Sequence, residues 1–377
     1  MKSRVLFVRS NPVNPDSRVE KEVLALCKND YEVSIFAWDR TKYYRNEVSY
    51  LKLENHEIKI ERVGIKAGYG EGFKKTIWKL LYFQLKIFFF LFVNRNKVDI
   101  IHACDFDTAL VCFICAKLFR KKIVYDIFDF YVDCCGVPNF LRNFILKCDL
   151  YIITHADAVI ICSEKRKEQI KGSIPKKLVI VENTPPKKNN QGKLMNLNKN
   201  KIKIAYVGVL LPKDRMIEDL LKIVARRKEL ELHIAGFGFL ETVIENYSLK
   251  YENIFFYEKL SYERALLLEK SCDIMTALYN PNIKNHYYAA PNKFYEAMML
   301  GKPLLMIKNT GMSEIVNKYN VGETIEFTAE SLENGILSLV SRKKEWNEIK
   351  IKMKKLYEEN FSWETMESRL IKLYEEL

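Results

Sequence analysis

Short apolar runs rich in β-branched residues alternate with longer stretches of helical periodicity along the first half of the chain. The first run, residues 5–8, precedes a helical pattern over Ser17–Lys28. Further runs of the same kind occupy residues 33–36, 58–63, 98–102, 122–126 and 158–162. Strands that alternate with helices predict βαβ units and a parallel sheet.

This pattern breaks at Pro185 and Pro186, and a Lys- and Asn-rich segment follows. A second series of strands begins at residue 202, continues over 230–235, 254–257, 274–277 and 303–307, and precedes a final helix over 361–377. We therefore predict an α/β protein of two doubly wound, Rossmann-like domains facing across a cleft. The predicted boundaries are 1–185, a polar linker over 186–201, 202–358, and a C-terminal helix over 359–377 that packs back toward the first domain. In such sheets ligands bind outside the carboxyl ends of the strands.

Composition narrows the class of protein and of partner. With 48% hydrophobic and 29% charged residues, the chain is neither disordered nor collagen-like. Lys and Arg number 61 against 48 Asp and Glu, so the net charge of +13 favours partners that carry phosphate. Nine scattered cysteines and no secretory signal indicate free thiols and a cytoplasmic protein.

The most apolar stretch, residues 77–93, predicts a helix at a membrane surface. It is at the short limit for a span and contains Lys79, Gln84 and Lys86. On a helix over 75–93, the lysines share one face and the aromatic residues form the opposite face, as in interfacial helices. A helix that packs on the sheet with its lysines in water remains the alternative.

Residues 291–303 predict a helix that begins after a proline and ends at Gly301. Lys293 and Glu296 share a face near the positive end of that helix. A cation there suits a diphosphate, and a carboxylate one turn later suits a ribose diol. A surface ion pair is the alternative interpretation of these two residues.

With these residues the chain resembles the retaining glycosyltransferases of the GT-B fold, in the family 4 group, and the subgroup with a PNKxxE donor motif. The order of several weak motifs carries the resemblance over nearly the whole chain. They are 16–22 (DSRVEKE), 98–103 (VDIIHA), 125–126 (YD), 156–163 (ADAVIICS), 205–208 (AYVG), 291–296 (PNKFYE), 311–316 (GMSEIV) and 361–364 (FSWE).

The resemblance implies a donor site in the second domain and an acceptor site in the first. Glu296 matches the second glutamate of the E-x7-E motif, whereas the position of the first glutamate is Tyr288. The family's arginine near the first glycine is Val209 here, and Arg215 stands roughly where a lysine binds the donor diphosphate. Lys293 is then a hypothetical substitute for the missing cation. The other implied donor-binding residues are Gly208, Gly236, Gly238 and Asn292.

In the first domain, the resemblance implies catalytic residues around the motif His102-Ala103-Cys104-Asp105. Cys104 replaces a second histidine of the family, which leaves Asp105 and His102 as candidate catalytic residues. Asp105 would orient the acceptor or take its proton; capping the next helix is the alternative. Arg18 is a candidate acceptor-binding residue that faces the cleft or, alternatively, solvent.

The predicted function is transfer of a sugar from a nucleotide-sugar, with UDP favoured over GDP, to a lipid-linked or cell-surface glycan with retention of configuration. We expect no cofactor and no metal, because Asp105-Phe106-Asp107 matches a metal-binding D-x-D by only three residues, directly before a helix. We expect no nucleic-acid partner, and peripheral attachment to the inner face of the cell membrane. A catalytically degenerate GT-B protein that binds a glycan or partner, or a nucleotide-sugar epimerase, remains the alternative.

Overall fold

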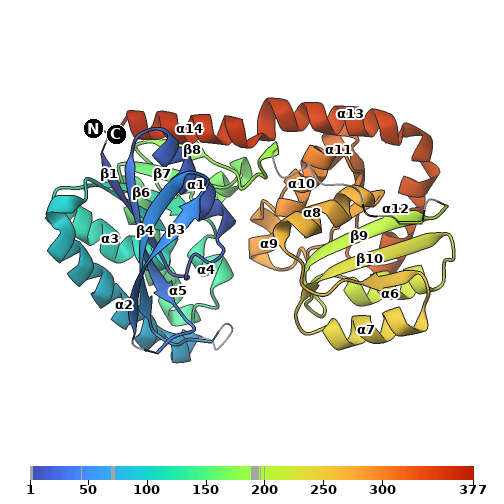
Figure 1. Ribbon diagram of the computed structural model, residues 1–377, viewed down its shortest axis with the longest axis horizontal. Helices are drawn as coiled ribbons and strands as arrows, with labels where there is room; N and C mark the ends of the chain where they lie inside the picture. The colour runs from blue at the N-terminus through green and yellow to red at the C-terminus, as the bar shows by residue number, and fades with distance from the viewer. Residues whose placement is uncertain (1–2, 44, 69–72, 188–194, 196, 199) are drawn as a thin grey trace. The chain divides into compact units, whose positions relative to one another are not determined.

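The computed structural model describes residues 3–377 except 44, 69–72, 188–194, 196 and 199. The chain divides into two compact units (Figure 1). Unit 1 comprises Met1–Glu182 and Met366–Leu377, and unit 2 comprises Asn183–Thr365. The first unit is therefore built from both ends of the chain.

Unit 1 contains an eight-stranded sheet in the order β3-β4-β2-β1-β5-β6-β7-β8. All neighbours pair in parallel except β3 and β4. The strands are β1 (Arg4–Arg9), β2 (Glu32–Asp39), β3 (Asn46–Leu53), β4 (His56–Gly64), β5 (Ile100–Cys104), β6 (Lys122–Ile127), β7 (Ala158–Ile161) and β8 (Leu178–Ile180).

Helices cover both faces of this sheet because its central strands are apolar on both sides. One face packs against α2 (Phe73–Asn94), α3 (Phe106–Leu118) and α5 (Asn139–His155) in the larger apolar core. The opposite face holds α1 (Ser17–Lys28) and the end of α14 (Trp363–Glu375), where Tyr374 contacts Tyr31. A single turn, α4 (Tyr131–Cys134), follows β6.

Unit 2 contains a parallel six-stranded sheet in the order β11-β10-β9-β12-β13-β14. One face packs against α6 (Ile217–Ala225), α7 (Glu241–Lys250) and α12 (Ala329–Ser341), and the other against α8 (Tyr262–Ser271), α10 (Asn292–Leu300), α11 (Ser313–Tyr319) and α13 (Trp346–Leu356). A short helix, α9 (Lys284–Tyr288), precedes α10. The strands are β9 (Ile202–Val209), β10 (Leu230–Phe237), β11 (Ile254–Phe256), β12 (Ile274–Ala277), β13 (Leu304–Ile307) and β14 (Gly322–Ile325).

The predicted fold class, two Rossmann-like α/β domains, is confirmed. Three strands were not predicted: β3, β8 and β14. β3 alternates exposed and half-buried residues at a sheet edge, and the other two are only three and four residues long. The linker predicted over 186–201 falls largely outside the described residues. The single final helix predicted over 361–377 is shorter, because a π-helical turn at Tyr357–Phe361 and extended Ser362 precede α14.

Candidate functional site

A pocket of about 290 Å³ lies at the carboxyl ends of β9 and β12 in unit 2. It contains five residues predicted from the sequence: Gly208, Arg215, Asn292, Lys293 and Glu296. Tyrosines 206, 262 and 279 complete much of its wall. The predicted donor residues are thus brought to one place, apart from Gly236 and Gly238.

Helix α10 presents two charged residues of this unit 2 pocket, Lys293 and Glu296. Pro291 takes the N-cap position and Gly301 ends the helix in the left-handed conformation, as the sequence indicates. The Lys293 ammonium lies 2.7 Å from Glu296 and 2.8 Å from Glu269 of α8, so it bridges two carboxylates. Tyr262 is also hydrogen-bonded to Glu296. Lys293 therefore fixes the position of the Glu296 carboxylate.

Burial and charge set the protonation of this group. Burial opposes the charge of Lys293, but attraction to Glu269 and Glu296 outweighs burial and raises its pKa. Burial, with repulsion from Glu296, raises the pKa of Glu269 to about 8 although Lys293 lowers it. Lys293 therefore stays charged, and Glu269 takes up a proton more readily than an exposed glutamate does.

Arg215 is the other cation in the pocket. Its Nη1 donates to the Asp214 carbonyl and lies 3.1 Å from His286 Nε2, and its guanidinium carbon lies 4.2 Å from the centre of the Tyr279 ring. Within the described part of the chain, no carboxylate forms an ion pair with it. Its charge is therefore available to an anionic ligand.

Gly208 and Gly236 have different roles at the ends of their strands. Gly208 lines the pocket with φ of 155°, and a Cβ there would meet no atom within 4 Å. Gly236 instead packs on Gly208, where a Cβ would lie 1.8 Å from the Gly208 carbonyl oxygen. Close packing of backbone against β9 and Leu210 requires glycine at 236 and 238, and the donor contact predicted for both residues stays a prediction.

A second pocket, of about 250 Å³, lies at the carboxyl ends of β1, β5 and β6 in unit 1. It contains Asp105, the single residue that joins β5 to α3. Its φ of 64° and ψ of 163° belong to a region that only glycine normally occupies. This strained backbone conformation arises because the Asp105 N–H still donates to the backbone carbonyl of Asp126 in β6. The Asp105 carbonyl already accepts from the first turn of α3.

Asp105 occupies the N-cap position of α3, but its side chain makes no capping hydrogen bond to that helix. Oδ1 accepts from the backbone N–H groups of Phe128 and Asp129, and Oδ2 accepts from Arg9. A carboxylate offers about four lone-pair positions, so Oδ2 retains one. Burial raises the pKa of Asp105 to about 6, although Arg9 opposes the shift.

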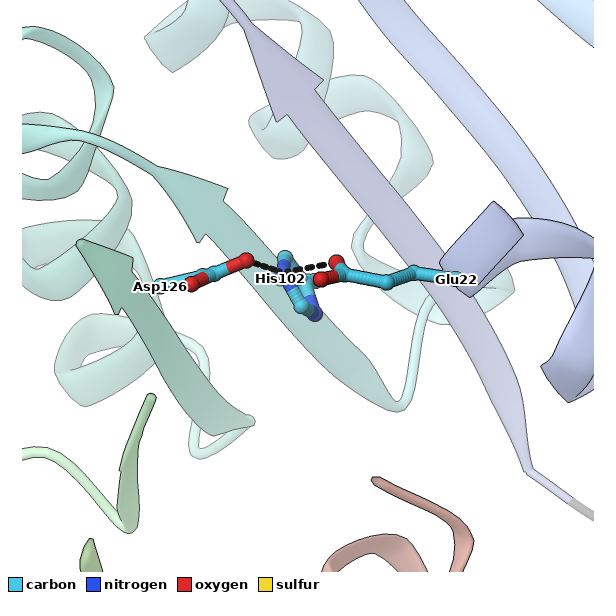
Figure 2. A group of neighbouring side chains, drawn as sticks. All are labelled: Glu22, His102 and Asp126. Carbon is cyan, nitrogen blue, oxygen red and sulfur yellow. Dashed lines mark ion pairs between the residues drawn. The ribbon is translucent and has the colours of Figure 1, made fainter. Parts of the chain in front are cut away.

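His102 and Arg18 belong to the interior and do not line this unit 1 pocket. Figure 2 shows His102 between Glu22 and Asp126, with Nε2 at 3.6 Å and 3.4 Å from their oxygens. Nδ1 lies 2.6 Å from the Tyr374 hydroxyl, and burial lowers the pKa of His102. A neutral, fully buried imidazole cannot reach a substrate in the pocket, so the catalytic role predicted for His102 is replaced by a structural one.

The guanidinium of Arg18 neutralises the same buried group. It donates to both Asp126 oxygens, lies 3.2 Å from Glu22, and donates to the Val181 carbonyl. Burial alone would raise the pKa of Asp126, but Arg18 and His102 lower it. Burial and the charge of Asp126 raise the pKa of Glu22, although Arg18 lowers it. The predicted acceptor contact of Arg18 is not formed, because only 4% of its surface is exposed.

Glu22, His102 and Asp126 also offer ligand atoms within 4.8 Å of one another, as a metal site would require. Arg18 already contributes the positive charge that a cation would bring there. The expectation of a metal-free protein remains a prediction.

Sequence reasoning missed Glu269, Tyr262 and Arg9. Arg9 ends the first strand, at the edge of the sheet where ligands bind, so its position was a usable signal. Glu269 and Tyr262 lie on α8, and nothing in their local sequence indicates that they meet Glu296 of α10.

Comparison with known proteins bears on the family and the fold of the chain. Residues 187–356 match the family model described as glycosyl transferases group 1. No curated protein matches the sequence. Among solved structures, sucrose-phosphate synthase from Thermosynechococcus elongatus is similar, with a TM-score of 0.75 and 15% identity over 100% of this chain and 99% of that one.

Two further similar structures contain nucleotide ligands. Anabaena HepE in complex with UDP has a TM-score of 0.73 and 15% identity, with 100% of each chain covered. The E. coli trehalose-6-phosphate structure bound with UDP-2-fluoro glucose has a TM-score of 0.72 and 11% identity, with 99% of each chain covered. The fold is thus GT-B, and the family match together with this fold supports a glycosyltransferase.

Arg18→Met should destabilise the protein by about 3–5 kcal/mol at pH 7, because it leaves buried carboxylates without their cation. The loss should be smaller at pH 5, because the uncompensated Asp126 then has a folded-state pKa above its unfolded value and regains a proton as pH falls. Urea unfolding of the variant and the wild type at both pH values measures the effect.

The matched control is Arg4→Met. Its ion pair with Asp99 is more than one-third exposed on both sides, so its loss should leave the free energy of unfolding close to that of the wild type. Equal effects of the two substitutions would contradict the role given to Arg18.

Proposed function

We propose that this protein transfers a sugar from a UDP-sugar to a lipid-linked or cell-surface glycan, with retention of configuration and without a metal. The observation that carries the proposal is the unit 2 pocket, which combines an unpaired arginine, a positioned carboxylate and an open glycine at the strand ends. The UDP and UDP-2-fluoro glucose bound to the two similar structures support UDP as the nucleotide.

In this proposal each polar group of the unit 2 pocket contacts one part of the donor. Glu296 accepts hydrogen bonds from the ribose hydroxyls, and Lys293 positions Glu296. Arg215 binds the diphosphate. Gly208 has no side chain, so the protein backbone can approach the diphosphate closely there. As the bond between the anomeric carbon and the diphosphate oxygen breaks, negative charge develops on the diphosphate, and Arg215 stabilises that charge.

The unit 1 pocket receives the acceptor in this proposal. The free lone pair of Asp105 Oδ2 accepts a hydrogen bond from the acceptor hydroxyl and orients its oxygen toward the anomeric carbon. A new carbon–oxygen bond then forms on the face from which the diphosphate leaves. The acceptor proton passes to the departing phosphate, so no strong base is required and a cysteine at position 104 is tolerated.

Unit 1 also has a surface suited to an anionic membrane. Apolar side chains are exposed along three neighbouring helices, α2, α3 and α5: Trp78, Leu81, Leu85, Phe89, Phe92, Leu110, Ile114, Leu118, Phe140, Phe144 and Tyr151. Helix α2 has no acidic residue; the single acids of α3 and α5 are Asp107, which lines the pocket, and buried Asp149. Apolar area flanked by lysines and free of exposed carboxylates favours anionic lipid.

One face of helix α2 packs on the sheet, and another face is exposed and apolar. Phe83, Ile87 and Leu91 are buried in the core, while Leu85 and Phe89 are exposed. Within the described residues, one stretch, Thr76–Lys97, is long and apolar enough to cross a membrane. Of its most apolar 18 residues, 17% are buried. Because one side of α2 packs on unit 1, we propose peripheral attachment, at the inner face of the cell membrane.

Incubating the protein with UDP-glucose, UDP-N-acetylglucosamine and GDP-mannose, each with a bacterial membrane extract and no added metal, tests the reaction as a whole. We expect a new glycosylated lipid or glycan from one UDP-sugar, with the donor's anomeric configuration by NMR. UDP binding without transfer would favour the degenerate alternative. A donor that is epimerised while free in solution would favour the epimerase.

Arg215→Ala should weaken UDP binding by about 10- to 100-fold, the cost of one charge-assisted contact to phosphate. Isothermal titration calorimetry measures this change. Arg226→Ala is the matched control, since Arg226 is exposed and paired with Glu333 at the end of α6. An unchanged affinity in Arg215→Ala would remove the diphosphate contact from the proposal.

The rate of transfer should rise with pH through about 6, because Asp105 accepts a hydrogen bond from the acceptor only when ionised and burial raises its pKa to that value. Asp105→Asn should slow transfer and abolish this rise, while UDP binding stays within about twofold. The pH dependence of kcat/KM for the acceptor measures both effects. A rise that persists in Asp105→Asn would assign it to another group.

Leu85→Ser/Phe89→Ser should reduce binding to vesicles of phosphatidylglycerol and phosphatidylcholine by at least about tenfold, because each side chain loses about 1.5–3 kcal/mol of burial. Cosedimentation measures binding, which should also weaken in 0.5 M salt. Leu249→Ser/Ile351→Ser is the control, since both residues lie on unit 2 and are more exposed than Leu85 and Phe89. Equal binding by the two double variants would contradict the membrane surface.

A further inference from the structure

Two cysteines that are neighbours in the sequence lie side by side in the unit 1 pocket. Cys134 ends α4 and Cys135 follows it, and their Sγ atoms are 2.8 Å apart. Both side chains line the pocket that contains Asp105. All nine cysteines are free thiols; of these, only Cys134 and Cys135 are exposed, while the other seven are buried or half-buried.

We infer that Cys134 and Cys135 form a reversible redox site that takes a low-molecular-weight disulfide as its oxidant and becomes a Cys134–Cys135 disulfide. The thiolate of one cysteine attacks a sulfur of the oxidant and releases one small thiol, leaving a mixed disulfide. The second cysteine then attacks the protein sulfur of that mixed disulfide and releases the second small thiol. Two protein thiols are thereby oxidised, one small disulfide is reduced to two thiols, and the two protons pass to the leaving thiolates.

Geometry favours this intramolecular bond over others in the chain. The two sulfurs must approach from 2.8 Å to only about 2.0 Å. Neighbouring Cα atoms are about 3.8 Å apart, however, below the usual range of about 4.4–6.8 Å for a disulfide. The bond would therefore be strained and easily reduced, which is the property of labile, regulatory disulfides.

Oxidation would change the wall of the pocket that also contains the strained Asp105. The strain would fall on the end of α4, because Asp133 is held by Arg142 and Gln169. Helix α4 also carries Tyr131, whose ring packs 5.3 Å from Phe106, the residue after Asp105. The redox site rests on the thiols alone; its consequence, loss of acceptor transfer on oxidation, rests on the proposed function.

Treating the whole protein with oxidised glutathione, alkylating with iodoacetamide and digesting it for mass spectrometry tests the site. We expect the peptide with residues 134 and 135 to lose two hydrogens and carry no alkyl group, and dithiothreitol to reverse this. Cys135→Ser should stop at the mixed disulfide on Cys134. Cys27→Ser, which removes a half-buried thiol of the same unit, should behave like the wild type.

Two stable glutathione adducts on the wild type, or dimers linked through either cysteine on a non-reducing gel, would overturn the redox site. For the consequence, oxidation should lower acceptor transfer by the wild type at least tenfold and keep UDP binding, and dithiothreitol should restore transfer. A disulfide that forms without slowing transfer would overturn the consequence and leave the site standing. A chain that transfers nothing when reduced would overturn the proposed function, and the disulfide would still be read in the mass spectrum.

Discussion

The buried guanidinium of Arg18 is the interaction on which the rest of unit 1 depends. A charge this deep is stable only when its partners are fixed, and those partners come from β6, α1 and the segment after β8. Asp126 also binds the buried imidazole of β5, which contacts Tyr374 of the last helix. One cation thereby joins α1, β6 and the segment after β8, next to the end of α14.

Unit 2 uses the same physics at its own pocket. There a buried lysine fixes two carboxyl groups, of which Glu296 lines the pocket while burial raises the pKa of the other, Glu269. The two pockets therefore differ in what they offer a ligand. In unit 2, the unpaired cation Arg215 suits an anion; in unit 1, the anion Asp105 is already neutralised by Arg9 and can accept only one more hydrogen bond.

The fold class and most strands were predictable because buried parallel strands are continuous apolar runs. The unit 2 pocket was also largely predictable, since Lys293 and Glu296 are close in sequence on one helix. The unit 1 pocket was less so. His102 and Arg18 have the chemistry of site residues, and only the pairing of β5 with β1 and β6 places them in the interior. The strain at Asp105 depends on the absence of a loop between β5 and α3, which residue types do not reveal.

The assembly of unit 1 from both ends of the chain has a consequence for biosynthesis. Domains usually fold in order as they leave the ribosome, but here the Tyr374 hydroxyl reaches buried His102 across 272 residues of sequence. Unit 1 can complete its core only after unit 2 has been synthesised. An interrupted chain would therefore expose an unfinished core to proteases, so that only full-length translation products would persist.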